Sequence, residues 1–310
     1  MRIGTGTIAI TGGSGFIGRY LVDDLKAAGY APVVLGRAPA PGARARQTDY
    51  GRESLKAVLE GVDAVVHLAG RRMTREDNRD DVAPFLHPNV EVVGNLMAAC
   101  ASAGVRKVIH ASTVAVYSPA SGHPYRETSP PHPINAYALS KLMGESCVEM
   151  HARLHGLAAL SLRFAAVYGH GEKGTPALMK FIDQAGRREK LVLKGNMDHR
   201  LDQIYIRDAT AAILSSLRAP CSAGVFNIGG GRALPVLEIA ETVNDVFDNA
   251  GNLSIEDDVK KEAPATVMDL EAARATLGWE PRFSLRGGLE DFRDTRDLAA
   301  LRADGFSMSV

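Results

Sequence analysis

The first 165 residues of this chain alternate between short apolar runs rich in β-branched residues and longer amphipathic segments. The expected strands are 7–11, 32–35, 64–68, 107–111 and 158–162, and the expected helices are 16–28, 89–103 and 136–155. Helices between successive strands indicate parallel strands, because each crossover must carry the chain back to the same end of the sheet. The sequence therefore predicts an α/β fold with a Rossmann-like, doubly wound parallel sheet.

The alternation becomes less regular after residue 169. A loop leads to a helix, a strand at 191–193, a helix at 207–217 and smaller elements that contain glycines. A chain of 310 residues also exceeds the usual size of one hydrophobic core. We expect the doubly wound sheet to form a domain over 1–168, to which a segment near 203–222 returns. The remainder, 169–310, is expected to form mainly a smaller α/β lobe.

Composition narrows the range of partners. Thirty-six basic residues balance thirty-six acidic ones, so charge gives no reason to expect nucleic acid or an anionic membrane. Cys100, Cys147 and Cys221 lack disulfide or zinc-ligand spacing, and the nine histidines form no metal-binding pattern. The N-terminus lacks a signal-peptide pattern, and no apolar run reaches membrane-spanning length. We expect a cytoplasmic protein without a metal site.

A glycine-rich loop separates the first expected strand from the first expected helix. It reads Thr11-Gly12-Gly13-Ser14-Gly15-Phe16-Ile17-Gly18 and contains the pattern G-x-G-x-x-G. Glycines permit a tight turn and a close approach of the backbone to a pyrophosphate, and the following helix directs its free N–H groups at the same charge. The loop therefore predicts a dinucleotide site at Gly12, Gly15, Phe16, Ile17 and Gly18. We expect 1–168 to be an NAD(P)-binding domain and 169–310 to be mainly a substrate-binding lobe.

The end of the second expected strand bears on the choice between NAD and NADP. An acidic residue there would bind the ribose hydroxyls of NAD, but the sequence has Gly36-Arg37. The guanidinium of Arg37 favours the 2′-phosphate of NADP, with a solvated surface arginine as the alternative interpretation. Asp49 is expected near the adenine edge, or else as a loop acid. Both cofactors stay open at this point.

Tyr137 and Lys141 are candidates for catalysis because they lie one helical turn apart on the helix expected at 136–155. A cation close to a phenol favours the phenolate and lowers the pKa of the tyrosine, which would make Tyr137 a base for a hydroxyl proton. Ser112 and Thr113 place hydroxyls at the carboxyl end of an expected strand, where doubly wound sheets bind their ligands. Either hydroxyl could polarise a substrate oxygen.

These motifs occur in the order found in the extended short-chain dehydrogenase/reductases. The chain resembles, more narrowly, the NAD-dependent epimerase/dehydratase family, which includes the nucleotide-sugar 4-epimerases. The resemblance rests on the loop 11–18, His67-Leu68-Ala69-Gly70, Asn89, Ser112-Thr113, Val116-Tyr117, Tyr137-x-x-x-Lys141, Leu162-Arg163-Phe164, Val167-Tyr168-Gly169 and Leu277-Gly278-Trp279-Glu280-Pro281.

The resemblance implies roles for individual residues. Thr113 would hydrogen-bond the reacting sugar oxygen, Tyr137 would be the general base, and Lys141 would lower its pKa and bind the nicotinamide ribose. Leu68, Ala69 and Gly70 would line the cofactor. The implied reaction oxidises C4 to a keto intermediate, which rotates and takes the hydride back on its other face. The family also implies a homodimer through the helices expected at 89–103 and 136–155.

The sequence departs from the family pattern in three places. The dehydratases carry Asp-Glu after the threonine, and Val114-Ala115 stand there instead, which argues against dehydration. The family usually has a substrate-contacting asparagine where this chain has Ala166. The arginine that usually precedes Asp-Phe-Ile-His-Val is replaced by Leu201, with Arg200 one residue away. Arg200 is expected to reach the substrate in its place; the alternatives are Lys173 or Lys194, or a substrate that is not a nucleotide diphosphate sugar.

Three functions follow from these observations. The first is an NAD(P)-dependent nucleotide-sugar 4-epimerase. The alternative is an NADPH-dependent reductase of a ketosugar or related carbonyl, in which Tyr137 would act as an acid. A non-catalytic cofactor-binding protein is the third. We interpret His67 and His110 as core histidines with satisfied hydrogen bonds, and Arg71 and Arg72 as a solvated pair of charges.

Overall fold

The computed structural model describes residues 5–38, 44–173, 177–258 and 265–295. Its largest sheet has seven strands in the order β10-β6-β5-β4-β1-β2-β3, and every pairing is parallel. The strands are β1 (Thr7–Thr11), β2 (Ala31–Gly36), β3 (Ala45–Gln47), β4 (Ala64–His67), β5 (Lys107–Thr113), β6 (Ala158–Phe164) and β10 (Ala223–Ile228). The predicted doubly wound α/β fold is confirmed.

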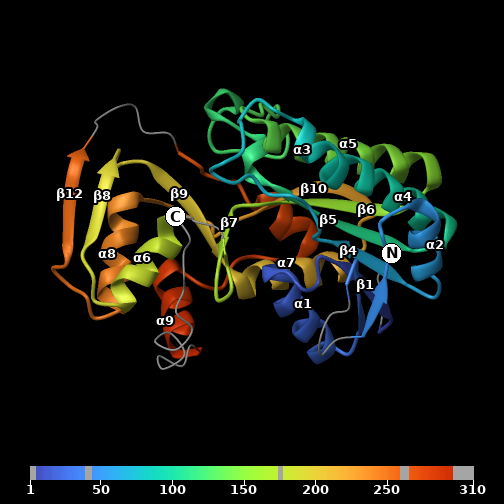
Figure 1. Ribbon diagram of the computed structural model, residues 1–310, viewed down its shortest axis with the longest axis horizontal. Helices are drawn as coiled ribbons and strands as arrows, with labels where there is room; N and C mark the ends of the chain where they lie inside the picture. Colours follow the sequence, from blue (N-terminus) through green and yellow to red (C-terminus); the bar gives the residue numbers. More distant parts are fainter. Residues whose placement is uncertain (1–4, 39–43, 174–176, 259–264, 296–310) are drawn as a thin grey trace.

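Helices cover both faces of this sheet (Figure 1). The first face carries α2 (Arg52–Val58), α4 (Val92–Ser102) and α5 (Ala136–His155), and the second carries α1 (Phe16–Ala27) and α7 (Ile206–Arg218). Alternate strand residues enter two different cores: Ala9 packs on the α4 side, while Ile8 and Ile10 pack on the α1 side. This alternation is the reason the strands read as continuous apolar runs.

Short helical segments connect the main elements. They are α3 (Ala83–Leu86), a π-helical turn (His87–Glu91), three-residue 3₁₀ turns (Val114–Val116 and Pro119–Ser121) and a second π-helical turn (Ala273–Leu277). The expected helix 89–103 therefore begins as a π turn and continues as α4. The predicted bounds of α5 are confirmed, and Asn135 is its N-cap, with its side chain accepting from the Ala138 N–H at 2.8 Å.

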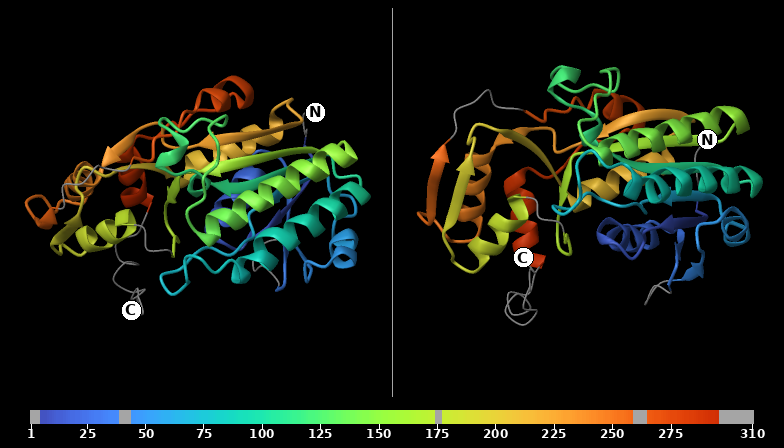
Figure 2. Two further views of the ribbon diagram at one scale, coloured as in Figure 1. Left: turned by 90° about the horizontal axis from the view of Figure 1, so that it is seen from above. Right: turned by 45° about the horizontal axis from the view of Figure 1, so that its top comes forward.

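The second half of the chain builds two smaller sheets beside the large one (Figures 1 and 2). One has the order β11-β9-β7 and the other pairs β12 with β8. The strands are β7 (Ala166–Tyr168), β8 (Leu191–Gly195), β9 (Arg200–Tyr205), β11 (Ala233–Pro235) and β12 (Leu253–Asp258), with helices α6 (Ala177–Gly186), α8 (Val236–Val246) and α9 (Leu285–Thr295). A separate apolar core holds these elements together, and α7 and β10 return to the large sheet.

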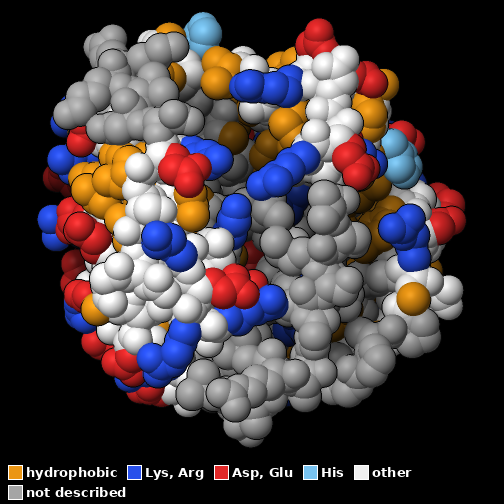
Figure 3. Space-filling model, turned by 60° about the vertical axis from the view of Figure 1, so that its left-hand side comes forward, with side chains coloured by type: hydrophobic (Ala, Val, Ile, Leu, Met, Phe, Trp, Pro, Cys, Tyr) orange, Lys and Arg blue, Asp and Glu red, His pale blue; other side chains and the backbone are white. Residues whose placement is uncertain are grey.

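The parallel strands bring one end of each predicted motif to a common edge. Thr11, Gly36, His67 and Thr113 all end strands of the large sheet, so the loops that follow them meet at its carboxyl edge. On the face in Figure 3, acidic and basic side chains are interspersed, as the balanced composition suggests. Within the described residues, no helix combines the length and the apolar character needed to cross a membrane.

Candidate active site

The glycine loop and the segment after β4 form one cradle. A Cβ at Gly12, where φ is 70°, would lie 2.8 Å from the backbone nitrogen of Ala69, so glycine is needed for this close approach. The Oγ1 of Thr11 accepts a hydrogen bond from the same Ala69 N–H at 3.2 Å. Gly15 is the N-cap of α1 and provides no side-chain cap, so the N–H groups at 16–18 can bind an anion. This shape fits the pyrophosphate of a dinucleotide.

Arg37 and Asp49 lie near the same edge, where Gly36 on β2 pairs with Gln47 on β3. Arg37 is exposed, and its carbonyl accepts from the side chain of Gln47 at 3.0 Å. The carboxylate of Asp49 accepts from the Gly51 N–H at 2.8 Å and closes the turn before α2. The guanidinium of Arg37 can therefore reach a ligand from solvent, whereas Asp49 already has a structural contact.

Thr113 and Tyr137 meet where β5 ends and α5 begins. The side chain of Thr113 hydrogen-bonds Tyr137, and its Oγ1 also accepts from the Ala115 N–H at 3.2 Å. Burial raises the pKa of Tyr137, while the Thr113 hydrogen bond and the positive charge of Arg72 lower it; the net shift is upward. The phenol thus has two neighbours that stabilise its ionised form.

Lys141 has a different electrostatic role from the one expected. Burial lowers the pKa of Lys141 to about 8, against a raising effect of Glu145. Its charge acts on His67 and His110, whose pKa values it lowers. We expected Lys141 to lower the pKa of Tyr137, but the cation with that effect in the described structure is Arg72.

Arg71 and Arg72 are both exposed, as expected of solvated charges, and each also forms an ion pair with an acidic side chain. Arg72 Nη1 donates to both carboxylate oxygens of Glu172, at 2.8 and 3.0 Å. Arg71 forms an ion pair with Asp77, and its guanidinium lies 5.4 Å from the centre of the Phe85 ring. That ring packs edge-on against Tyr137, since the two centroids are 6.2 Å apart at 63°. Sequence reasoning missed Glu172, which lies 100 residues beyond Arg72.

Asn89 ties the loop after β4 to the first turn of α5. Its Oδ1 accepts from the Arg71 N–H at 2.8 Å, and its Nδ2 donates to the Arg71 carbonyl at 3.0 Å and to Ser140 Oγ at 2.9 Å. Ser140 in turn donates to the Tyr137 carbonyl at 2.7 Å. Asn89 is buried inside the π turn. These bonds fix the position of Tyr137 relative to the cradle formed by the glycine loop and the segment after β4.

A buried network supports α5 from the sheet. Arg163 Nη2 donates to Glu145 Oε2 at 2.6 Å, and Arg163 Nη1 donates to the hydroxyl of Tyr117 at 2.6 Å. The hydroxyl of Ser112 also donates to Glu145. Because Glu145 follows Lys141 by one helical turn, the network holds a carboxylate at a fixed place near that ammonium.

His67 and His110 are buried and stack with ring centroids 5.5 Å apart. Nδ1 of His67 hydrogen-bonds Thr11 Oγ1 at 2.7 Å. Its Nε2 and both nitrogens of His110 have no hydrogen-bond partner among the described residues, so the expectation of satisfied histidines was wrong. Burial first, and then the charge of Lys141, lowers the pKa of His67 to about 3 and that of His110 well below its usual value.

Two places where the sequence departs from the family pattern lie on β7 and β9. Ala166 is exposed at the start of β7. Leu201 packs against the core of the smaller lobe, while Arg200 is exposed and donates to the Ala233 carbonyl at 3.4 Å. Lys194 forms an ion pair with Glu256 at 3.0 Å. Substrate binding by Arg200 stays a prediction. Among the described residues, no cluster of His, Cys, Asp or Glu could hold a metal ion.

Known proteins resemble nearly the whole chain. A model of the NAD dependent epimerase/dehydratase family matches residues 8–229. UDP-glucose 4-epimerase from Azospirillum brasilense is 32% identical over 313 residues, covering 91% of this chain and 89% of that protein. The crystal structure of UDP-N-acetylglucosamine 4-epimerase from Bacillus cereus is 33% identical, with a TM-score of 0.85 over 93% of this chain and 95% of its own. UDP-glucuronic acid 4-epimerase from Bacillus cereus, in complex with UDP-glucuronic acid and NAD, is 25% identical, with a TM-score of 0.80 over 95% and 99%.

Proposed function

The chain belongs to the NAD-dependent epimerase/dehydratase family, as its motifs predict, and we propose that it is a nucleotide-sugar 4-epimerase. The observation that carries this proposal is the hydrogen bond between Thr113 and Tyr137 at the carboxyl edge of the sheet, beside the glycine cradle. A hydroxyl and a phenol at this place can hold one sugar oxygen between them. Val114 and Ala115, which directly follow Thr113, carry no group for the acid–base chemistry of a dehydration.

The residues divide the work at the C4 oxygen. The nicotinamide, when bound, supplies the hydride acceptor and donor. Thr113 orients the C4 hydroxyl, and Tyr137 Oη takes its proton as C4 is oxidised and returns the same proton as the keto group is reduced. Arg72 and Thr113 favour the phenolate that accepts this proton. The reaction starts and ends with the same number of protons and electrons, so no second substrate is consumed.

We propose that Gly12, Gly15, Phe16, Ile17 and Gly18 hold the pyrophosphate and that Leu68, Ala69 and Gly70 face the nicotinamide half. Retained NAD is the cofactor that best suits an epimerase, because each turnover contains one oxidation and one reduction of the sugar and so regenerates the cofactor. The exposed Arg37 favours NADP instead, and with it the reductase alternative. The cofactor that copurifies with the protein, identified by absorbance and mass spectrometry, separates the two.

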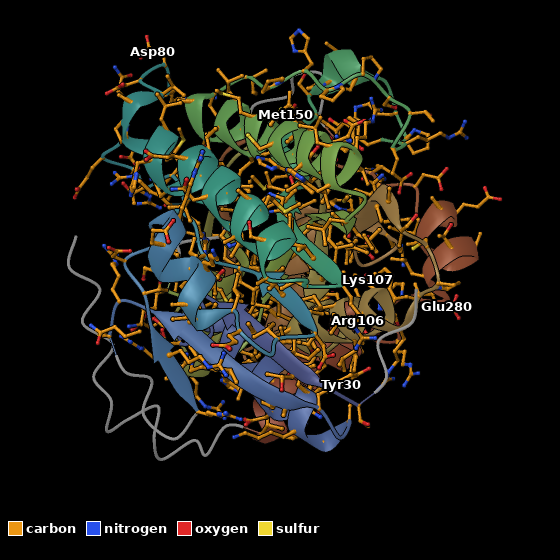
Figure 4. All side chains as sticks on the ribbon, turned by 90° about the vertical axis from the view of Figure 1, so that its right-hand side faces the viewer. Tyr30, Asp80, Arg106, Lys107, Met150 and Glu280 are labelled. Atoms are coloured by element: carbon orange, nitrogen blue, oxygen red, sulfur yellow. The ribbon has the colours of Figure 1, made fainter. Side chains whose placement is uncertain are left out.

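Exposed apolar side chains on α5 support a homodimer. Leu139, Met143, Met150 and Leu154 are 41%, 36%, 49% and 69% exposed and recur at helical spacing. Figure 4 labels Met150 on α5, and α4 runs beside this helix in all views. We propose that α4 and α5 pack against the same helices of a second copy, which would cover these side chains. We also propose that the protein is cytoplasmic.

The test of the function is turnover without added cofactor. The purified protein is incubated with UDP-glucose, UDP-N-acetylglucosamine and UDP-glucuronate, and the C4 epimers are separated by chromatography. Interconversion of one pair supports the epimerase. Stoichiometric consumption of NADPH with a keto sugar would support the reductase, and full activity in a Tyr137→Phe protein would remove Tyr137 from catalysis.

A further inference from the structure

Ala166 and Gln203 lie side by side on two neighbouring strands. β7 pairs with β9 in parallel, and the register places Ala166 opposite Gln203. Side chains at paired positions of parallel strands extend from the same face of a sheet. The two residues therefore share one face, with a methyl group from one strand and an amide from the other.

This face begins close to the catalytic threonine. In the large sheet Thr113 pairs with Phe164, and Ala166 follows Phe164 by two residues at the point where the chain leaves that sheet for the smaller one. Ala166 is exposed. Ala166, the first residue of β7, thus lies at the edge of the candidate active site. Its neighbour on β9 is Gln203.

The amide of Gln203 has an unused acceptor. Its Oε1 is buried and has no hydrogen-bond partner among the described residues. Asp202, which precedes Gln203 on β9 and extends from the opposite face, accepts from the Gly230 N–H at 2.7 Å. A buried carbonyl oxygen without a donor is unfavourable, so this atom is suited to a ligand that brings an O–H or N–H group.

The sequence pattern also indicates a role for an amide on this face. Where the family usually has asparagine, this chain has Ala166, and where Asp-Phe-Ile-His-Val has phenylalanine, it has Gln203. The chain has thus lost an amide on β7 and gained one at the paired position of β9. One carboxamide is present on this face in either arrangement.

We propose that Gln203 is a specificity-determining residue whose side-chain carbonyl accepts a hydrogen bond from a hydroxyl of the sugar. A hydroxyl suits the orphan acceptor because it donates, whereas the ionised diphosphate offers acceptors only. The inference rests on the proposed function and deepens it: the ligand of this residue is the hexose, and the nucleotide is bound elsewhere.

Gln203→Leu tests the proposal, because leucine has a similar size and no amide. UDP without a sugar is the folding control. By calorimetry, the variant is expected to bind UDP within about twofold of the unmodified protein and UDP-glucose, or the UDP-sugar that the protein prefers, about tenfold more weakly, the usual scale for one lost polar contact. Unchanged affinity for that UDP-sugar, or an equal loss for UDP and UDP-sugar, would overturn the proposal.

A paired exchange provides the second test. Gln203→Phe alone should lower kcat/KM about tenfold or more. Adding Ala166→Asn should recover most of this loss, because the amide returns to the same face from the adjacent strand. Failure of the double variant to exceed Gln203→Phe would contradict the idea that one amide serves both arrangements. If the unmodified protein converts no UDP-sugar, the proposed function fails. If the unmodified protein turns over normally and the Gln203 variants show the same kcat/KM, only the inference about Gln203 fails.

Discussion

Arg72 forms an ion pair with both carboxylate oxygens of Glu172 and so joins the loop after β4 to the loop after β7. Glu172 is buried and Arg72 is largely exposed, so the carboxylate fixes the position of the guanidinium. Since the charge of Arg72 lowers the pKa of Tyr137, the ion pair with Glu172 influences the protonation state of the candidate base.

Replacing Arg72 should therefore shift the pH dependence of the reaction. Arg72→Met removes the cation, so the pKa of Tyr137 rises further and the acidic limb of kcat/KM moves to higher pH. A shift of about one pH unit is expected for a partly screened charge. Arg75→Met is the control, because Arg75 is an exposed arginine of the same loop. A pH profile equal to that of the control would show that Arg72 does not act on the base.

Lys141 should be costly for stability at neutral pH. Burial lowers its pKa to about 8 from the usual lysine value of 10.5, so between these values the unfolded chain binds more protons than the folded one. The cost of the buried charge is thus complete below pH 8 and disappears as the pH approaches 10.5.

The expected result is a stabilised but impaired Lys141→Met protein. Its free energy of unfolding at pH 7 should rise by on the order of 2 kcal/mol, with the gain shrinking towards pH 10. Urea denaturation at several pH values measures this, and Lys56→Met, at an exposed position, is the control. A destabilisation of equal size at pH 7 and pH 10 would refute the prediction.

His110 should contribute to acid sensitivity. Burial holds its pKa well below 6.5, so as the pH falls through 6.5 the unfolded state takes up a proton that the folded state does not, and stability decreases. His110→Leu should make this decrease between pH 6.5 and 4 shallower by up to about 1.4 kcal/mol per pH unit. His123→Gln, at an exposed position, is the control. Equal slopes of the free energy of unfolding against pH for the two variants would count against a role of His110 in acid sensitivity.

Charge on the outer face of α5 should disrupt the proposed homodimer. Met150→Glu places a carboxylate among the exposed apolar side chains of that helix, where a partner helix would have to bury it. Light scattering coupled to size-exclusion chromatography should then report a monomer mass. Ile255→Glu is the matched control, because Ile255 is 46% exposed but lies on β12 in the smaller lobe. A dimer that survives Met150→Glu would place the interface elsewhere.

The elements that sequence predicted best are those specified by local residues. The five expected strands of the large sheet and the helix α5, including its cap at Asn135, follow from short apolar runs and from a residue directly before the helix. β3 and β10 were not expected. β3 is only three residues long, and β10 joins the sheet beside β6 from far along the chain. Pairings of that kind depend on tertiary contacts rather than on local pattern.

The candidate site shows the same limit. The cradle of Gly12 with Ala69 and the meeting of Thr113 with Tyr137 agree with the motifs that predicted them. Helical spacing places Lys141 on the same helix face as Tyr137, and its role at that phenol stays a prediction. The sequence did not indicate that the charge of Arg72 also acts on Tyr137. Arg72 is brought there by Glu172, and no local signal connects two residues 100 positions apart.

In the proposed reaction, one molecule of sugar loses and regains its own C4 hydride. The most direct measurement uses UDP-glucose deuterated at C4, incubated with the purified protein without added cofactor and followed by proton NMR and mass spectrometry. The expected product is an epimer that keeps its deuterium at C4, and the rate should fall about 1,000-fold in Tyr137→Phe. Formation of an epimer that has lost the label, or no C4 epimerisation of this or any other UDP-sugar, would contradict it.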